Sequence, residues 1–160
     1  MDQITFNPVG IIHTPHKKPE GTPIQPPASD ARGTVEIFPE FSKGLKDIEG
    51  FSHLELLFYC HRAGEHKLVV EPFMDETPRG VFATRAPSRP NSIGLSVVKL
   101  IGRDENILEV DGVDMLDETP LLDIKPHVPA MEESEEIRTG WLDENIKKMT
   151  SIRDDGRFTD

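Results

Sequence analysis

Short apolar stretches separated by polar loops make up most of the hydrophobic pattern of this chain. Residues 53–61 are almost continuously apolar, which is typical of a strand covered on both faces. Residues 33–38 alternate between apolar and polar side chains, as in a strand with one buried face. The other candidate strands are residues 9–13, 69–73, 80–84, 93–101, 107–113 and 121–124. About eight strands with little helix between them predict a mainly β fold, a single compact antiparallel or mixed β-barrel.

Two segments have helical character. Residues 39–48 predict a short helix with a proline in its first turn. Residues 133–149 predict a C-terminal helix, because they are rich in helix formers and place Lys147 and Lys148 late, as the helix dipole favours. The final residues, 151–160, are polar and are expected to fray as a flexible tail.

Composition narrows the class of protein. A length of 160 residues suits one domain with a single core. The net charge of −11 argues against binding to nucleic acid or membranes through bulk charge. The single cysteine, Cys60, lies in an apolar stretch and is predicted to be a small buried apolar residue rather than a nucleophile. Neither a signal peptide nor a membrane-spanning run of roughly 20 apolar residues is apparent, so we expect a cytoplasmic protein without a membrane partner.

Charge is unevenly distributed along the chain. Residues 79–103 hold five basic and no acidic residues, whereas residues 104–118 hold seven acidic and no basic ones. Turn and cap chemistry accounts for regularly spaced aspartates at the end of a strand about as well as a binding site does. The spacing also lacks the alternating ligands and terminal glutamate of a calcium loop. The aspartates in question are Asp111, Asp114 and Asp117.

Two loops are candidates for ligand binding. Residues 14–30 carry five prolines and almost no apolar periodicity, so that loop either binds something or is disordered. Residues 85–96, Arg-Ala-Pro-Ser-Arg-Pro-Asn-Ser-Ile-Gly-Leu-Ser, combine rigid prolines, a permissive glycine, two guanidiniums and a carboxamide. His53 and His61 lie on one face of a predicted strand but lack a third ligand, so no metal site is expected.

Residues 85–96, together with Asp114-Met-Leu-Asp-Glu-Thr-Pro-Leu-Leu-Asp-Ile-Lys-Pro126, resemble the signature of the TsaA-like family. Residues 8–15, 50–54 and 80–85 extend this resemblance, which covers roughly residues 4–130. The family includes a tRNA adenosine methyltransferase. The usual Rossmann fingerprint is absent, so composition and periodicity alone do not indicate S-adenosylmethionine.

The resemblance implies a β-barrel methyltransferase that acts as a homodimer. Its reaction would transfer a methyl group from S-adenosylmethionine to the exocyclic nitrogen of threonylcarbamoyl-adenosine, beside the anticodon of tRNA. Together with the helical pattern and polar end that follow it, the resemblance divides the chain into a barrel domain over residues 1–130, an expected helical extension over 131–150 and an expected flexible tail over 151–160. By position, the family's cofactor contacts fall on Pro26, Pro27, Ala28, His61, Arg62, Arg85, Leu95, Asp111, Gly112, Val113 and Asp114.

Each part of that cofactor needs a different partner. Arg85 or Arg62 could bind its carboxylate through a planar guanidinium. Asp111 or Asp114 could hydrogen bond to the ribose hydroxyls or neutralise the charge of the sulfonium. Backbone groups near Gly112 and Leu95 could hydrogen bond to the edge of the adenine. Because a carbamoylated adenine nitrogen is a poor nucleophile until its proton leaves, a general base is expected. The base candidates are Asp117 and Asp123, with Lys125, Arg89 and Asn91 orienting the acceptor.

The acidic composition leaves other functions open. A tRNA would need a local basic track, for which residues 79–103 with Lys17, Lys18 and Arg32 are candidates. The main alternative is a barrel that binds the cofactor or another nucleotide as a sensor or scaffold without catalysis. A methyltransferase acting on a different acceptor is a third reading.

Overall fold

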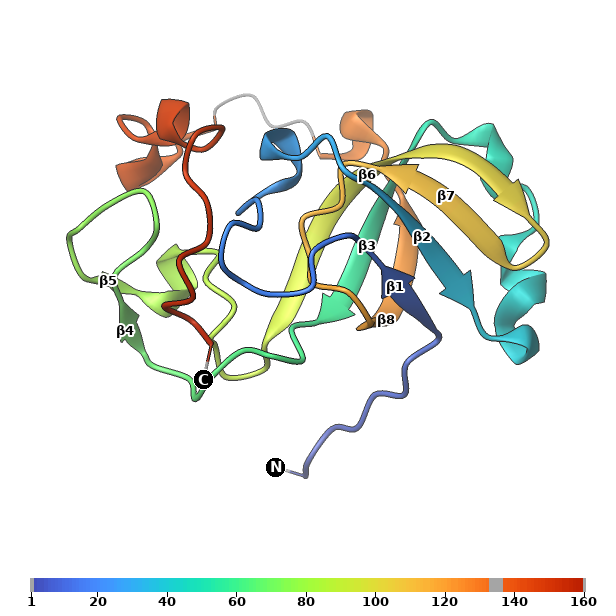
Figure 1. Ribbon diagram of the computed structural model, residues 1–160, viewed down its shortest axis with the longest axis horizontal. Coiled ribbons are helices and arrows are strands. Elements are labelled where there is room, and N and C mark those ends of the chain that lie inside the picture. The colour runs from blue at the N-terminus through green and yellow to red at the C-terminus, as the bar shows by residue number, and fades with distance from the viewer. Residues whose placement is uncertain (1, 133–136, 160) are drawn as a thin grey trace.

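The computed structural model describes residues 2–132 and 137–159, and in these the main feature is a closed antiparallel barrel (Figure 1). Its strands close in the order β1-β2-β7-β6-β3-β8, and every pairing is antiparallel, which confirms the predicted fold class. The strands are β1 (Gly10–His13), β2 (Arg32–Ile37), β3 (His53–Tyr59), β6 (Ile93–Asp104), β7 (Ile107–Asp111) and β8 (Thr119–Pro126).

Side chains from alternate positions of the strands fill the interior of the barrel. In β2 and β3 every second residue is buried, and the interior is occupied by branched aliphatic side chains. Gly94 of β6 lies against the ring of Phe58, where a Cβ atom would fall inside van der Waals contact. The largest fully buried side chains include Ile12, Val35, Leu54, Leu56, Val98, Leu108, Val110 and Leu121.

Beside the barrel, β4 (Val69–Val70) and β5 (Arg79–Gly80) form a separate two-stranded ribbon. The prediction of a strand over residues 80–84 is wrong beyond its first residue, because the chain turns into the 3-10 helix η4 (Val81–Ala83). The backbone N–H and the hydroxyl of Thr84 both donate to the carbonyl of Val81, and these two hydrogen bonds close the turn. Val81 is buried there, so the apolar residue that suggested a strand packs from a turn instead.

The predicted helices are shorter than expected. Residues 39–48 form two 3-10 helices, η2 (Pro39–Leu45) and η3 (Ile48–Gly50), because Asp47 between them has a positive φ of 68°. Two further 3-10 turns begin at prolines, η1 (Pro26–Ala28) and η5 (Pro129–Met131). Proline is suited to a first helical position because its φ is preset and it has no N–H to satisfy.

The C-terminal segment differs most from prediction. Of the helix predicted over residues 133–149, residues 133–136 lie outside the described residues. The rest forms two short 3-10 helices, η6 (Gly140–Leu142) and η7 (Ile146–Lys148), rather than one continuous helix. Gly140 has a positive φ of 56°, which interrupts a regular helix. Trp141 Nε1 donates to the carbonyl of Ala83 at 2.8 Å, and this tertiary contact outweighs the helix propensity of the segment.

Residues 151–159 pack against the loops beside the barrel rather than fraying. Phe158 is buried and its ring meets that of Phe73 edge-on at 4.9 Å. Isolated bridges pair Arg153 with Pro23 and Thr159 with Ala63. Figure 1 shows this segment, in red, on the same side of the barrel as the β4–β5 ribbon. Within the described residues, no helix is both long and apolar enough to cross a lipid bilayer.

Candidate functional site

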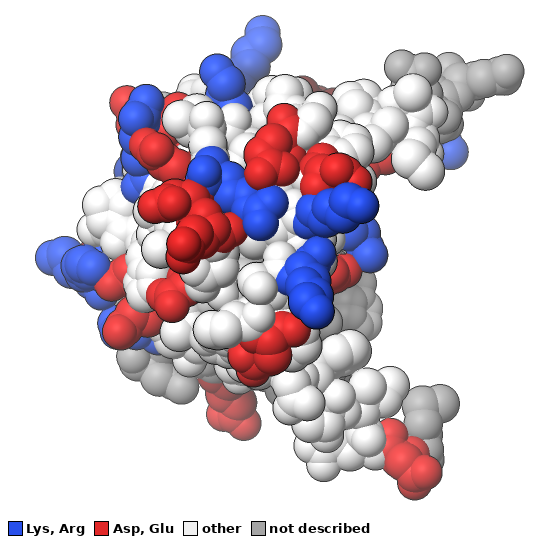
Figure 2. Space-filling view, turned by 90° about the vertical axis from the view of Figure 1, so that its right-hand side faces the viewer, with Lys and Arg blue, Asp and Glu red and all other residues white. Residues whose placement is uncertain are grey.

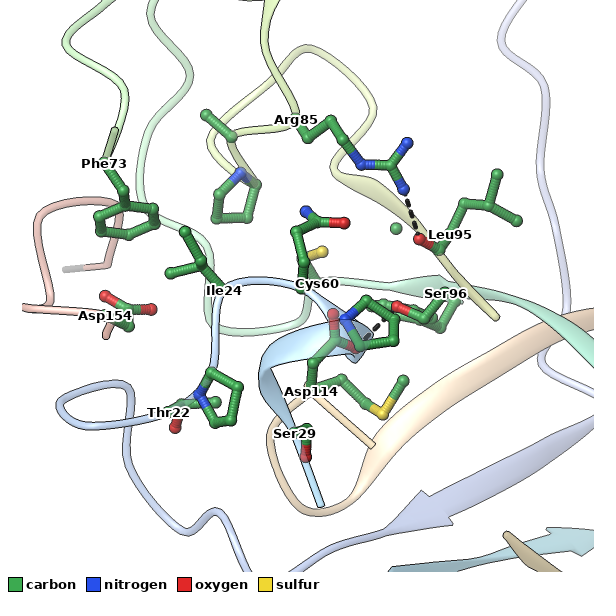
Figure 3. Close-up of a pocket in the computed structure, with 18 of the residues that line it drawn as sticks. Thr22, Ile24, Ser29, Cys60, Phe73, Arg85, Leu95, Ser96, Asp114 and Asp154 are labelled. Atoms are coloured by element: carbon green, nitrogen blue, oxygen red, sulfur yellow. Dashed lines mark hydrogen bonds between the residues drawn. The ribbon is translucent and has the colours of Figure 1, made fainter. Parts of the chain in front are cut away.

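A cavity of about 1220 Å³ lies where the barrel meets these surrounding segments. Its walls come from the proline loop, the end of β3, residues 85–96, the turn after β7 and the C-terminal segment. Polar groups on the walls alternate with apolar side chains (Figure 3). Small-molecule pockets usually enclose about 300–1,000 Å³ between apolar walls and a few polar groups, so this cavity has room for a nucleotide-sized ligand.

Asp114 is the most perturbed acid on the cavity wall. The residue keeps some solvent exposure, but its carboxyl group is enclosed by protein, and this burial raises its pKa to about 6. Ser96 Oγ donates to Asp114 Oδ1 at 2.7 Å and partly offsets the rise, as does the nearby Arg85. A carboxyl group whose pKa is raised this far by burial is more typical of a binding site than of a surface turn.

The turn after β7 explains why Asp114 points to the cavity. Gly112 has a φ of 89°, and its N–H donates to the carbonyl of Ala31 at 2.9 Å. Val113 is fully buried in the core, and its carbonyl accepts from Ser29 Oγ at 2.6 Å. The side chain of Val113 therefore anchors the turn in the barrel and does not line the cavity.

Asp111 supplies a second acid to the lining. Arg32 Nε lies 3.0 Å from Asp111 Oδ1, but Arg32 forms its hydrogen bond through Nη1 with Glu109. Asp111 Oδ1 is closed off from solvent beside the Arg32 guanidinium, whereas the Asp111 side chain as a whole is 33% exposed. The exposed part of this side chain lines the cavity, where a carboxylate can accept a hydrogen bond from a ligand hydroxyl.

The two arginines of the 85–96 segment have different roles. Arg85 is exposed at the cavity and donates through Nη2 to the carbonyl of Leu95 at 2.8 Å, which leaves further N–H groups on its guanidinium (Figure 3). Arg89 Nη1 instead donates to the carbonyls of Thr84 and Ala86 at 3.1 and 3.2 Å. Arg89 therefore braces the loop from within. Asn91, an exposed turn residue, does not line the cavity.

The end of β3 contributes a basic side chain and an imidazole. His61 Nδ1 lies 3.4 Å from Thr119 Oγ1, and burial together with the neighbouring Arg62 lowers the pKa of His61. Arg62 is exposed and donates to the carbonyl of Lys17 at 3.2 Å. Both line the cavity. Burial raises the pKa of the Cys60 thiol to about 12, so Cys60 is no ready nucleophile.

The proposed base candidates lie outside the cavity lining. Asp117 accepts from the backbone N–H of Thr14 at 2.9 Å and pairs with Lys17, whose hydrogen bond lowers the pKa of Asp117. Asp123 pairs with Lys125 at 2.9 Å, and this contact raises the pKa of Lys125. The structure therefore brings most of the predicted cofactor contacts and Arg89 to one cavity, and leaves Asn91, Asp117, Asp123 and Lys125 outside its lining.

The C-terminal segment supplies lining residues that the sequence did not suggest. Trp141, Asp154 and Phe158 all face the cavity. Burial raises the pKa of Asp154, whose backbone N–H donates to the carbonyl of Thr22 at 2.9 Å. Two aromatic residues in an otherwise polar stretch were the available signal. Among the predicted contacts, Pro26 and Pro27 line the cavity and Ala28 follows them in η1.

A closed β-barrel with a mixed polar and apolar cavity beside its rim defines a small-molecule-binding β-barrel protein. A family model described as the tRNA-methyltransferase O N-terminal domain matches residues 11–133. The chain belongs to this family, which confirms the resemblance seen in the sequence motifs.

Similar proteins carry two kinds of name. A "probable S-adenosyl-L-methionine-binding protein" of Pyrococcus abyssi is 58% identical over 97% of this chain and 85% of its own length. The "tRNA (adenine(37)-N6)-methyltransferase" of Escherichia coli is 35% identical over 82% of this chain and 61% of its own length. A crystal structure of TrmO from Pseudomonas aeruginosa has a TM-score of 0.74 at 39% identity, covering 89% of this chain. The present chain spans 64% of that solved one.

Proposed function

We propose that this chain binds S-adenosylmethionine in the cavity beside its barrel and methylates the exocyclic nitrogen of threonylcarbamoyl-adenosine next to the tRNA anticodon. The observation that carries the proposal is the presence of two acids, Asp111 and the enclosed Asp114, with Arg85 around one cavity. The names of the relatives support it, since several are called S-adenosylmethionine-binding proteins.

The residues of the cavity suit the cofactor's chemistry. Asp111, which lines the cavity, would accept from a ribose hydroxyl through its carboxylate. Asp114 would balance a positive charge, and a bound cation would in turn lower the cost of keeping this carboxylate ionised. The unused N–H groups of Arg85 would bind a carboxylate. When bound, S-adenosylmethionine supplies an electrophilic methyl group on a sulfonium.

Positioning is the main contribution expected from the protein. Arg89 and Ser88 fix the 85–96 loop through bonds to backbone carbonyls, which would hold donor and acceptor in a defined geometry. Of the titratable groups here, His61 is the strongest base candidate. Burial favours its neutral form, and the charges of Asp117 and Glu118 would stabilise the imidazolium after proton uptake.

This assignment gives Asp117 a supporting role in place of direct proton transfer. Asp123 and Lys125 form an ion pair on β8 that would contact the acceptor only from outside the cavity. Asn91, exposed at the tip of its turn, would have the same kind of role.

Binding of tRNA would depend on the rim of the cavity rather than on a broad basic face. Arg79 and Arg103, at the two ends of the basic stretch, pair with Asp75 and Glu49 at 2.6 and 3.0 Å. On the face at the right of Figure 1, acidic and basic side chains are interspersed (Figure 2). Among the basic residues, Arg62, Arg85 and Lys99 line the cavity and would contact phosphates there.

We also propose a homodimer, because apolar side chains face outward on neighbouring strands of the barrel. Tyr59 of β3 lies opposite Ile93 of β6, and both are exposed by 40% or more of their surface. Leu95, two residues along, is 42% exposed, and like Ile93 it lies on the cavity wall, so the patch adjoins the cavity. A second copy covering this patch would complete the cavity rim. Light scattering coupled to size-exclusion chromatography would give twice the mass of 18.0 kDa.

Calorimetric titration of the whole chain with S-adenosylmethionine tests the proposal first. Saturable binding of one equivalent per chain is expected, and absence of binding at millimolar cofactor would refute it. A sensor or scaffold would bind equally well but leave every tRNA unmodified, and a methyltransferase for another acceptor would methylate something other than threonylcarbamoyl-adenosine.

A further inference from the structure

Three potential metal ligands, Glu55, His127 and Glu132, converge on the outer side of the barrel. Glu55 lies on β3, His127 directly follows β8, and Glu132 follows η5. One ligand atom from each lies within 4.8 Å of the other two. His127 Nδ1 is 2.9 Å from Glu55 Oε1 and 4.0 Å from Glu132 Oε1. From this convergence we infer a binding site for a divalent cation of the zinc class.

The barrel holds two of the three ligands rigidly. Leu54 and Glu55 pair with Pro126 and Lys125 in the β3–β8 ladder, and the N–H of His127 continues it by donating to the carbonyl of His53 at 3.1 Å. The side chains of Glu55 and His127 are only 16% and 23% exposed. Ligands on adjoining strands keep their separation, which is what a preformed metal site needs.

The donor set suits zinc. Imidazole nitrogen and carboxylate oxygen bind Zn²⁺ at about 2.0–2.2 Å, which puts tetrahedral ligand atoms roughly 3.3 Å apart. The separations of 2.9 and 4.0 Å from His127 lie on either side of that value, and all three ligand atoms lie within 4.8 Å of one another, so the approach needed to bind an ion is short. Three protein ligands with a fourth position open is a common zinc arrangement. Glu55 and Glu132 also line the cavity, so the ion would be reachable from it.

Local charge also favours a cation. Glu55 and Glu132 place two carboxyl groups within 4.8 Å of each other, and two carboxylates at such a distance repel. The ammonium group of Lys125, a basic residue nearby on β8, pairs with Asp123 at 2.9 Å. A divalent ion bound between the two glutamate carboxylates would relieve this repulsion.

Zinc titration of the untagged, chelator-treated whole chain tests this inference without any methylation assay. Wild type is expected to bind one equivalent of Zn²⁺. Loss of an outer hydrogen-bond partner weakens metal binding by about 10–100-fold, so His127→Ala and Glu55→Gln, which each remove a ligand, should lower the affinity by at least about tenfold. Co²⁺ should give visible absorption that these variants lose.

Matched controls separate this site from adventitious binding. His66→Ala and Glu76→Gln change exposed residues outside the cluster and should leave the zinc affinity unchanged. If a substitution on the strands prevents folding, Glu132→Gln replaces it, because Glu132 is 58% exposed on a turn. Absence of saturable zinc binding would overturn the inference. So would an affinity that His127→Ala and Glu132→Gln leave unchanged, or one that the controls lower equally.

Discussion

Replacing Asp114 by asparagine should stabilise the free protein at neutral and alkaline pH while impairing ligand binding. The substitution keeps an oxygen that can accept from Ser96 Oγ, but removes the charge that burial penalises. A rise in pKa from 3.8 to about 6 corresponds to at most about 3 kcal/mol of lost stability. Water entering the cavity, and the nearby Arg85, reduce this upper limit.

The pH dependence has a definite sign. Below pH 3.8 the Asp114 carboxyl group is protonated in both the folded and the unfolded chain, so it costs nothing. Between pH 3.8 and about 6 the unfolded chain releases its proton first, and the folded state loses stability as the pH rises. Above pH 6 both states are ionised and the penalty stays constant.

Urea unfolding of wild type and Asp114→Asn from pH 4 to pH 8 measures this penalty directly. The variant should gain up to about 3 kcal/mol at pH 8 but less than about 1 kcal/mol at pH 4. Asp104→Asn, at an exposed end of β6, should show no such trend. Because Asp114→Asn removes the charge that would balance the sulfonium, S-adenosylmethionine should bind the variant about tenfold or more weakly, a loss of about 1.4 kcal/mol or more. An equal stability difference at every pH would refute the reasoning.

Three further substitutions test the packing and the site. Phe158→Ala should cost about 3–5 kcal/mol in urea unfolding because the ring is buried, whereas Ile137→Ala, at an exposed side chain, should cost little; equal losses would contradict a packed tail. Arg85→Ala should weaken cofactor binding in calorimetry with little change in melting temperature, and the reverse result would remove Arg85 from the site. Gly94→Ala should lower stability by about 3 kcal/mol, because its methyl group would overlap the ring of Phe58; a melting temperature like that of wild type would show that the ring can move.

The barrel could be predicted from the sequence because its strands carry the signal in their own side chains. Alternating or continuous apolar residues over 33–38 and 53–61 correspond to β2 and β3, whose buried positions face one interior. The same rule failed for residues 80–84. There, burial of Val81 comes from a turn closed by the Thr84 hydroxyl, and no periodicity records such a bond.

The cavity could be predicted only in part. Arg85, Asp111 and Asp114 were predicted as cofactor contacts because they belong to motifs shared with the family, and these three meet at one cavity. The wall formed by Trp141 and Phe158 could not be predicted, because it depends on contacts between residues far apart in sequence. A propensity-based reading gives such a segment a helix and a frayed end, although tertiary contacts decide its structure.

Transfer of labelled methyl groups tests the central claim most directly. The whole chain would be incubated with methyl-labelled S-adenosylmethionine and two otherwise identical tRNAs, one with and one without the threonylcarbamoyl group on the adenosine beside the anticodon. The account predicts label on the exocyclic nitrogen of that adenosine in the modified tRNA alone. No incorporation into either tRNA, by a chain that binds the cofactor, would contradict it.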